Sequence, residues 1–363
     1  MDFHHPEDRQ ALADTLGRYL FDRYTFTTRD RIALSDAGWS AEHWRALADL
    51  GIVGALFGEH AGGYGGDAFD IGVVYQAIGK ALVVEPFLGT LMAGRAIEAI
   101  SGPDDLLGEV IAGGKILAFA HQEPLGRYAP ESVQTSGSRS GGGWTLSGAK
   151  AVIPHLEAAD AIVVSARTDG EPGDPSGISL FLVRKDAPGL SVRGYPMIDG
   201  GRGGELTLSD TPATLLGQEH GGFDIVEAVI AAGNVALAWE AVGVMDALKT
   251  ATLDFLRLRK QFGVAIGKFQ VLQHRMATLA LEIEQARSAA INAAAVLHAD
   301  RTVRERAISA AKYTIGRVGT LVAEEVIQLH GGIGMTWELP LSHHAKRLTM
   351  IGHQLGDEDY HLE

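Results

Sequence analysis

One long apolar stretch without proline, residues 225–258, limits what this chain can fold into more than any other feature. As a single helix it would extend roughly 50 Å, because each helical residue adds about 1.5 Å. Two further stretches, 271–299 and 302–329, also lack proline and are rich in alanine, whose small side chain lets helices pack closely. Three long helices and the segment that follows them predict a four-helix-type bundle over residues 221–363.

The segment before this bundle has a different sequence pattern. Residues 116–220 contain short apolar runs separated by Gly, Pro, Asp and Ser, which is typical of antiparallel β structure, and we expect 136–143 and 169–177 to be hairpin loops. Residues 1–115 show helical spacing of apolar side chains, with Ser40 as a candidate helix N-cap. The predicted fold class is α+β, with an N-terminal helical domain (1–115), a middle antiparallel β domain (116–220) and a C-terminal helical bundle (221–363).

Charge and composition exclude several classes of protein. Lys and Arg number 31 and Asp and Glu 45, so the formal charge is −14 at pH 7 and nucleic-acid binding is not expected. The chain has no cysteine, which excludes disulfides, thiolate metal sites and a cysteine nucleophile. No apolar run approaches the ~18–20 residues of a membrane span. The N-terminus lacks the basic and apolar parts of a signal peptide. We therefore expect no membrane span and a cytoplasmic location.

Common motifs for phosphate binding and nucleophilic catalysis are missing. The sequence contains no P-loop, no nucleophile elbow and no G-x-G-x-x-G. Neither of its two adjacent histidine pairs has a third histidine at a usual ligand spacing, so no metal site is expected.

The segment after the first long helix carries the first informative motif. Arg259 precedes Phe262 by three residues, and Gly263 and Gly267 interrupt the helix before it restarts at about Gln270. A guanidinium in this position can bind a pyrophosphate through two hydrogen bonds while the ring packs on a planar ligand. Taken alone, the pattern equally suits an arginine in a surface ion pair and a phenylalanine in the core.

A second motif ends the third long helix. Gln328 is followed by Gly331, Gly332 and Gly334. Glycines there permit positive φ and the close approach of a ligand to the backbone. An ordinary glycine cap of the helix is the alternative explanation.

Together these motifs, in this helical–β–helical order, resemble the acyl-CoA dehydrogenase family. The loop 58–66, the pair Glu123-Pro124 and the run 148–150 resemble further segments of that family. The resemblance implies FAD as cofactor, an acyl-CoA thioester as substrate, α,β-dehydrogenation, and an electron-transfer flavoprotein that reoxidises the flavin. The FAD-binding residues that it implies are Arg259, Phe262, Ile266, Gln270, Gln328, Gly331 and Gly332.

The chain departs from the family where a catalytic base is needed. An ungapped comparison after the glycine motif places Leu355 at the position of the usual catalytic glutamate. Gly233 and Asn234 occupy the position that a minority of the family uses instead. Asp357 and Glu240 are the nearest fallback bases, although solvated acids or partner-facing charges would explain both.

The chain's own flavin contacts also differ from those of the family. Arg127 and Tyr128 replace a Gly-Ser pair, and Pro154 replaces a hydrogen-bonding threonine. In the family each FAD lies between two chains. This chain keeps the motifs that contact the FAD of a neighbouring chain, and it lacks those that would contact its own FAD. It resembles the small subunits of pimeloyl-CoA-type dehydrogenases, which implies an α2β2 heterotetramer with a second acyl-CoA dehydrogenase subunit. Two alternatives stay open: an active homo-oligomer with an unusual base, and a non-redox scaffold or acyl-CoA binder.

Overall fold

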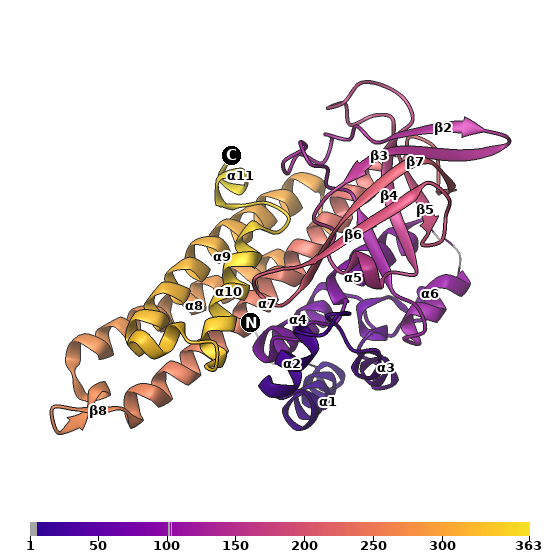
Figure 1. Cartoon of the computed structure of the whole chain (residues 1–363). Coiled ribbons are helices and arrows are strands. Elements are labelled where there is room, and N and C mark those ends of the chain that lie inside the picture. Colours follow the sequence, from indigo (N-terminus) through magenta and orange to yellow (C-terminus); the bar gives the residue numbers. More distant parts are fainter. Residues whose placement is uncertain (1–5, 101, 103) are drawn as a thin grey trace. The chain divides into compact units, whose positions relative to one another are not determined.

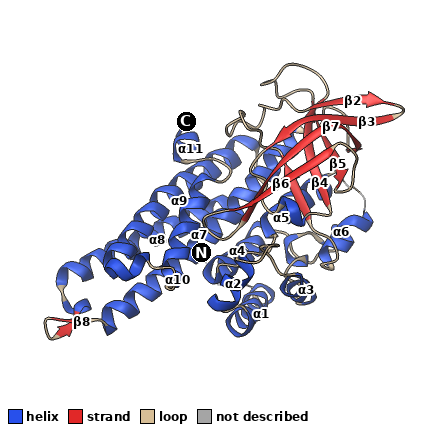
Figure 2. Ribbon diagram, in the orientation of Figure 1, coloured by secondary structure: helices blue, strands red, loops and turns tan. Residues whose placement is uncertain are grey.

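The computed structural model describes residues 6–100, 102 and 104–363. The chain forms two compact units that alternate along the sequence. Residues 6–30, 68–83 and 234–363 make up a helical unit, and residues 31–67 and 84–233 make up a unit that contains the β-sheet. Figures 1 and 2 show the elements of both.

Four long helices dominate the helical unit, as the proline-free stretches predict. They are α7 (Phe223–Leu258, whose first turns belong to the other unit), α8 (Gln270–Ala295), α9 (Arg301–His330) and α10 (Pro340–His353). Helix α9 packs against α8, α10 and the short α11 (Glu358–Leu362), while α4 (Ala68–Ala81) packs against α1 (Glu7–Arg23) and α8. Glycine allows α4 and α7 to meet closely: a Cβ at Gly243 would collide with the carbonyl of Gln76.

Helix α7 is apolar because it is buried. Its length and composition alone would suit a membrane-spanning helix, with a mean hydropathy of 1.6 in its most apolar window. However, 89% of that window is buried inside the protein, as in the core helix of a globular unit. The sequence argument against a membrane span counts uninterrupted apolar residues. The apolar residues of α7 are interrupted by polar ones, so α7 stands out only when hydropathy is averaged over a window.

Among the described residues, the second unit contains a seven-stranded sheet. The strands pair in the order β1-β4-β2-β3-β7-β5, β5 pairs back to β4, and β6 adds to β7. The barrel-like closure surrounds a core that includes Leu146, Ile162 and Phe181. The strands are β1 (Leu117–Ala120), β2 (Ser136–Ser140), β3 (Gly143–Lys150), β4 (Ala161–Arg167), β5 (Ile178–Arg184), β6 (Leu190–Pro196) and β7 (Arg202–Leu216).

Two details of this sheet differ from the sequence prediction. Strand β1 pairs parallel to β4, and β2 makes one parallel bridge to β4, whereas the other pairings are antiparallel. A parallel neighbour needs a long connection, and the β2–β3 hairpin between β1 and β4 provides it. In addition, residues 136–143 are not simply a loop: Ser136–Ser140 is strand β2, and only Gly141 and Gly142, both with positive φ, form the turn.

Short helices complete the description. Ser40 caps α3 as predicted, because its Oγ accepts a hydrogen bond of 3.3 Å from the His43 amide. The remaining elements are α2 (Phe26–Ala33), α3 (Ala41–Asp49), α5 (Phe87–Ala99), α6 (Asp104–Ile111), η1 (Gly54–Leu56), η2 (Glu59–Ala61) and η3 (Leu156–Ala158).

Candidate functional site

The Arg259–Phe262 motif forms an exposed hairpin between α7 and α8. Strands β8 (Lys260–Gln261) and β9 (Val264–Ala265) are joined by Phe262 and Gly263, both with positive φ, as a two-residue hairpin turn requires. The Phe262 side chain is 91% exposed, so the interpretation of Phe262 as a core residue is wrong. A positive φ is uncommon for a bulky residue. The Phe262 ring packs edge-on against Phe269, with the two ring centroids 6.1 Å apart, and is otherwise exposed.

Backbone bonds fix Arg259 while its side chain stays available. Its amide donates to the Phe255 carbonyl over 2.8 Å, and its carbonyl accepts a 2.8 Å bond from the Ile266 amide. Ile266 opens a 3-10 turn, η4 (Ile266–Lys268), and Gln270 is the first residue of α8. Within the described part of the chain, the exposed Arg259 guanidinium contacts no carboxylate, so the alternative of a surface ion pair finds no support here.

The second motif closes α9 and opens η5 (Gly331–Met335). Gly331 has a φ of 69°, and its amide bonds to the carbonyls of Gln328 and Ile327, which is a glycine cap. Gly332 is different, because its φ is not in the left-handed region. A Cβ placed on either glycine would meet nothing within 4 Å. The fold therefore requires glycine at 331 for its conformation, whereas both positions leave open space that a ligand could occupy.

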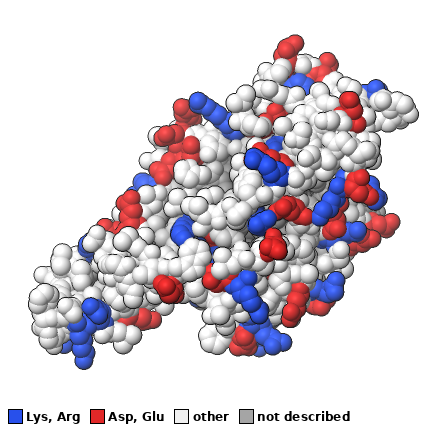
Figure 3. All heavy atoms as spheres, in the orientation of Figure 1, with Lys and Arg blue, Asp and Glu red and all other residues white. Residues whose placement is uncertain are grey.

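The two motifs lie at the same end of the helical unit. The rings of Phe255 and His330 stack with their centroids 4.3 Å apart, and these residues lie close to Arg259 and Gly331 respectively. Figure 1 shows β8 and the end of α9 at this end, and Figure 3 shows mostly uncharged atoms there, together with a group of basic side chains. Several large apolar side chains of these segments are exposed, namely Leu258, Phe262, Phe269, Val271, Ile333 and Met335.

The turn after α10 contains the position at which the resemblance places the usual base. Leu355 adopts a φ of 56°, and its carbonyl accepts hydrogen bonds from Asn234 Nδ2 (3.5 Å) and His361 Nε2 (3.1 Å). The two alternative base positions of the family therefore meet here, and neither Leu355 nor Asn234 has an ionisable side chain. Burial lowers the pKa of His361 to about 4, so this imidazole is neutral near pH 7.

Glu240, the first fallback base, is engaged elsewhere. Only 6% exposed, it accepts two hydrogen bonds from Arg347, Nε to Oε1 at 2.5 Å and Nη2 to Oε2 at 2.7 Å. Arg347 also binds the Gln354 side chain at 3.0 Å. The interpretation of Glu240 as a solvated acid is wrong, because a partner 107 residues away takes up both of its oxygens.

Asp357, the second fallback base, caps a helix. Its carboxylate accepts a 2.9 Å bond from the Tyr360 amide at the start of α11. Nearby, Lys312 is buried and donates to the Ile351 carbonyl at 2.7 Å. Burial and the charge of Arg347 lower the pKa of Lys312 to about 7, although Asp357 opposes the shift. The surroundings of the turn are thus held together by buried polar contacts.

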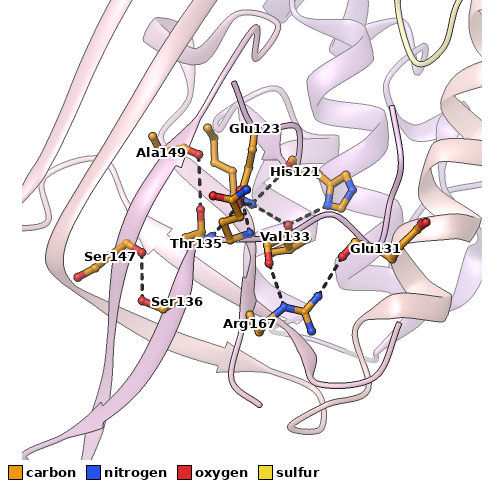
Figure 4. Close-up of polar contacts among 12 residues, drawn as sticks. His121, Glu123, Glu131, Val133, Thr135, Ser136, Ser147, Ala149 and Arg167 are labelled. Atoms are coloured by element: carbon orange, nitrogen blue, oxygen red, sulfur yellow. Dashed lines mark hydrogen bonds and ion pairs between the residues drawn. The ribbon is translucent and has the colours of Figure 1, made fainter. Parts of the chain in front are cut away.

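In the β unit, Glu123 and Lys150 form a buried ion pair that the sequence did not reveal (Figure 4). Lys150 Nζ donates to Glu123 Oε1 (2.8 Å), the His121 carbonyl (3.0 Å) and Ser165 Oγ (3.1 Å). Glu123 also accepts the amides of Gln134 and Thr135. Glu123 and Lys150 belong to separate sequence motifs, and their separation of 27 positions in the sequence gives no indication of the ion pair.

The network shifts the titration of its members. Burial alone would raise the pKa of Glu123, but the charge and hydrogen bond of Lys150 and the Thr135 bonds bring it below the ordinary value. Burial lowers the pKa of Lys150 to about 8 despite the nearby carboxylate. Burial and the Lys150 charge lower the pKa of His121 to about 3. Glu123 therefore serves the fold of the β unit, and its carboxylate is already occupied.

The segments that replace the family's own flavin contacts have unusual backbones. Arg127 is exposed with a φ of 46°, and Val152 and His155, which flank Pro154, have φ values of 54° and 51°. Positive φ is rare for a β-branched residue such as Val152. Pro154 can donate no backbone hydrogen bond. Pro154 therefore offers neither the hydroxyl group nor the amide hydrogen that the resemblance would require at its position.

No group of three or more His, Asp or Glu side chains within residues 6–100, 102 and 104–363 is placed to hold a metal ion. The buried acids described above, Glu123 and Glu240, are hydrogen-bonded to Lys150 and Arg347. The site chemistry that the described residues offer is therefore that of a guanidinium, exposed rings and a glycine-lined backbone.

Comparisons with known proteins agree with this architecture. Residues 118–211 match the acyl-CoA dehydrogenase middle domain, and residues 220–363 match the acyl-CoA dehydrogenase C-terminal domain. The chain is 30% identical over 322 residues to a long-chain specific mitochondrial acyl-CoA dehydrogenase of Rattus norvegicus, covering 84% of this chain and 73% of that protein.

Solved structures give the same result. A variant of the Tcur3481-Tcur3483 steroid ACAD superposes with a TM-score of 0.89 at 29% identity, covering 98% of this chain and 96% of that one. The FAD complex of PigA has a TM-score of 0.90 at 25% identity, covering 100% and 97%. The fold expected from the sequence, with helical N- and C-terminal parts and a middle β domain, is confirmed, and the chain belongs to the acyl-CoA dehydrogenase family.

Proposed function

We propose that this chain is the non-catalytic subunit of an FAD-dependent acyl-CoA dehydrogenase, and that it completes the flavin site of a different, catalytic chain. The enzyme removes one hydrogen from each of the α and β carbons of an acyl-CoA thioester. The assembly is an α2β2 heterotetramer with fewer flavins than chains, and an electron-transfer flavoprotein accepts the electrons.

One observation carries the proposal: the groups that a neighbour would use are exposed, whereas residues of other types stand where the chain would use its own. Arg259 and Phe262 project from a hairpin into solvent, and Gly332 leaves open space. At the turn that should carry the base stand Leu355 and Asn234.

The residues present suit FAD, which when bound would supply an acceptor for the hydride that leaves the β carbon. The Arg259 guanidinium would bind the negatively charged pyrophosphate through two hydrogen bonds. The exposed Phe262 ring would cover an apolar face of the dinucleotide and exclude water from it. Gly331 and Gly332 would let backbone amides approach the ligand without an intervening side chain. The α-proton would be removed by a carboxylate of the partner chain, because Leu355 and Asn234 carry none and Asp357 caps α11.

The geometry argues against the homo-oligomeric alternative. A general base needs a carboxylate that can reach the substrate and change its protonation state. Arg347 occupies both oxygens of Glu240, and Asp357 caps α11. Similar proteins support a two-chain enzyme: the steroid ACAD similar to this chain carries a name that joins two designations, Tcur3481 and Tcur3483. The alternative of a non-redox scaffold gives no reason for the exposed Arg259 side chain beside the hairpin.

Co-expression tests the proposal. The chain is purified alone and together with the product of a neighbouring acyl-CoA dehydrogenase gene, and acyl-CoA oxidation is measured with an artificial electron acceptor. We expect turnover from the pair and none from this chain alone. Turnover by this chain alone would overturn the proposal, and so would full activity of the neighbour without this chain.

A further inference from the structure

The ring pair Phe255–His330 joins the two motifs assigned above to FAD. Phe255 lies in the last turn of α7, and its carbonyl accepts the Arg259 amide at 2.8 Å. His330 is the last residue of α9 and directly precedes Gly331. The backbones of Phe255 and His330 are therefore joined to the two motifs by a hydrogen bond and a peptide bond, respectively, and their two rings stack on each other.

The pair has a defined geometry. The ring centroids are 4.3 Å apart and the planes are inclined by 26°, so the rings stack face to face. His330 Nδ1 lies 2.8 Å from the Val326 carbonyl, which can only accept, so the proton of the neutral imidazole is on Nδ1. Burial lowers the pKa of His330, which keeps the ring neutral near pH 7. The imidazole is thus fixed in orientation by its own helix and presents a face to Phe255.

We infer that Phe255 and His330 are positioning residues that set the separation between Arg259 and the Gly331–Gly332 backbone, and so the affinity for FAD. The inference rests on the proposed function, because it assigns the ligand that both motifs share. A rigid link matters here because Arg259 lies at the edge of a hairpin, and a hairpin with only two residues in each strand is marginally stable by itself.

A double-mutant cycle tests the inference in the complex of the full chain with its catalytic partner. The FAD dissociation constant is measured by flavin fluorescence for Phe255→Ala, His330→Ala and the double variant. We expect each single change to weaken FAD binding about tenfold, at the upper end of what aromatic pairs contribute. We expect the double variant to lose little more than either single one, because both remove the same contact.

Two conservative variants separate positioning from general stability. Phe255→Tyr keeps the ring, and His330→Phe keeps the stack while losing the bond to Val326. Both are expected to retain FAD affinity. Leu281→Ala, at a 67% exposed position on α8, serves as the control and should change nothing.

The outcomes are distinguishable. If the alanine variants lower the melting temperature but leave the FAD dissociation constant unchanged, the pair is only structural and the inference is wrong. A hundredfold loss in the double variant would mean that the two rings act independently, which also overturns it. If the wild-type complex binds no FAD at all, the proposed function itself fails.

Discussion

Arg347 holds both carboxylate oxygens of Glu240, at 2.5 and 2.7 Å, across 107 residues of sequence. The Arg347 and Glu240 side chains are 15% and 8% exposed. This carboxylate links α10 to α7 through two hydrogen bonds, which take up both of its oxygens. We therefore expect Glu240 to be a structural acid and not a catalytic one. The effects of its replacement on stability and on turnover distinguish the two roles.

Glu240→Ala should cost stability. Removing one partner of a buried ion pair leaves the Arg347 charge unpaired, which costs about 3–5 kcal/mol. Urea unfolding of the chain measures the free energy of unfolding. Asp357→Ala, which should weaken only a helix cap by about 1 kcal/mol, is the matched control. Normal stability of Glu240→Ala together with lost turnover in the complex would instead make Glu240 the base.

Lys312→Met should change how stability depends on pH. The pKa of Lys312 is about 7 in the folded chain and about 10.5 when unfolded. Between these values the unfolded state binds more protons, so this residue makes the folded state more stable as pH rises from about 7 to 10.5. The methionine variant lacks that contribution. Its stability advantage over the wild type should be largest below pH 7 and shrink towards pH 10.

Urea unfolding at several pH values between 6 and 10 measures the Lys312 difference, since other titrating groups cancel between the two proteins. Parallel curves for wild type and Lys312→Met would show that the lysine is not perturbed by its burial.

Arg259→Ala should weaken FAD binding to the complex without unfolding it. The guanidinium is exposed, so the free energy of unfolding should stay within about 0.5 kcal/mol of the wild type. A charge-assisted hydrogen bond contributes about 1.5–3 kcal/mol, which corresponds to a loss of affinity of roughly 10- to 100-fold. Lys260→Ala removes an exposed positive charge from the next residue and should have little effect. Equal losses from both changes would point to general electrostatics.

The two glycines of the second motif should respond differently to alanine. Gly331→Ala places a Cβ on a residue with a φ of 69°, which costs about 1–2 kcal/mol of stability. Gly332→Ala meets open space in the chain itself and should fold normally, yet its methyl group would occupy the space assigned to the ligand. We therefore expect lower flavin content in Gly332→Ala at an unchanged melting temperature. Unchanged flavin content would remove Gly332 from the site.

Local signals were sufficient to predict part of the structure. The long helices lack proline over the whole of α7, and the Ser40 cap depends on residues three positions apart. The glycines show where the helix is interrupted. They do not show that Phe262 is exposed, because a phenylalanine at this position would equally suit the core. Family resemblance, and not periodicity, pointed to Arg259 and Gly332 as a site.

Contacts between distant residues were beyond the reach of the sequence. The parallel pairing of β1 with β4 and the bond between Lys150 and Glu123 depend on the final register of the sheet. The same holds for Glu240, for which a solvated acid was one explanation and which is buried and hydrogen-bonded to Arg347. Strand propensity also failed at Ser136–Ser140, since pairing with β3 outweighs the poor β preference of Ser and Gly.

The ratio of flavin to protein in the assembled complex tests the central claim most directly. Native mass spectrometry gives the subunit composition of the co-purified complex, and the visible absorbance of the released flavin gives its amount. We predict two copies of each chain and one FAD for every two polypeptides, with the chain alone colourless. One FAD for every copy of this chain, in an assembly of this chain alone, would contradict the account.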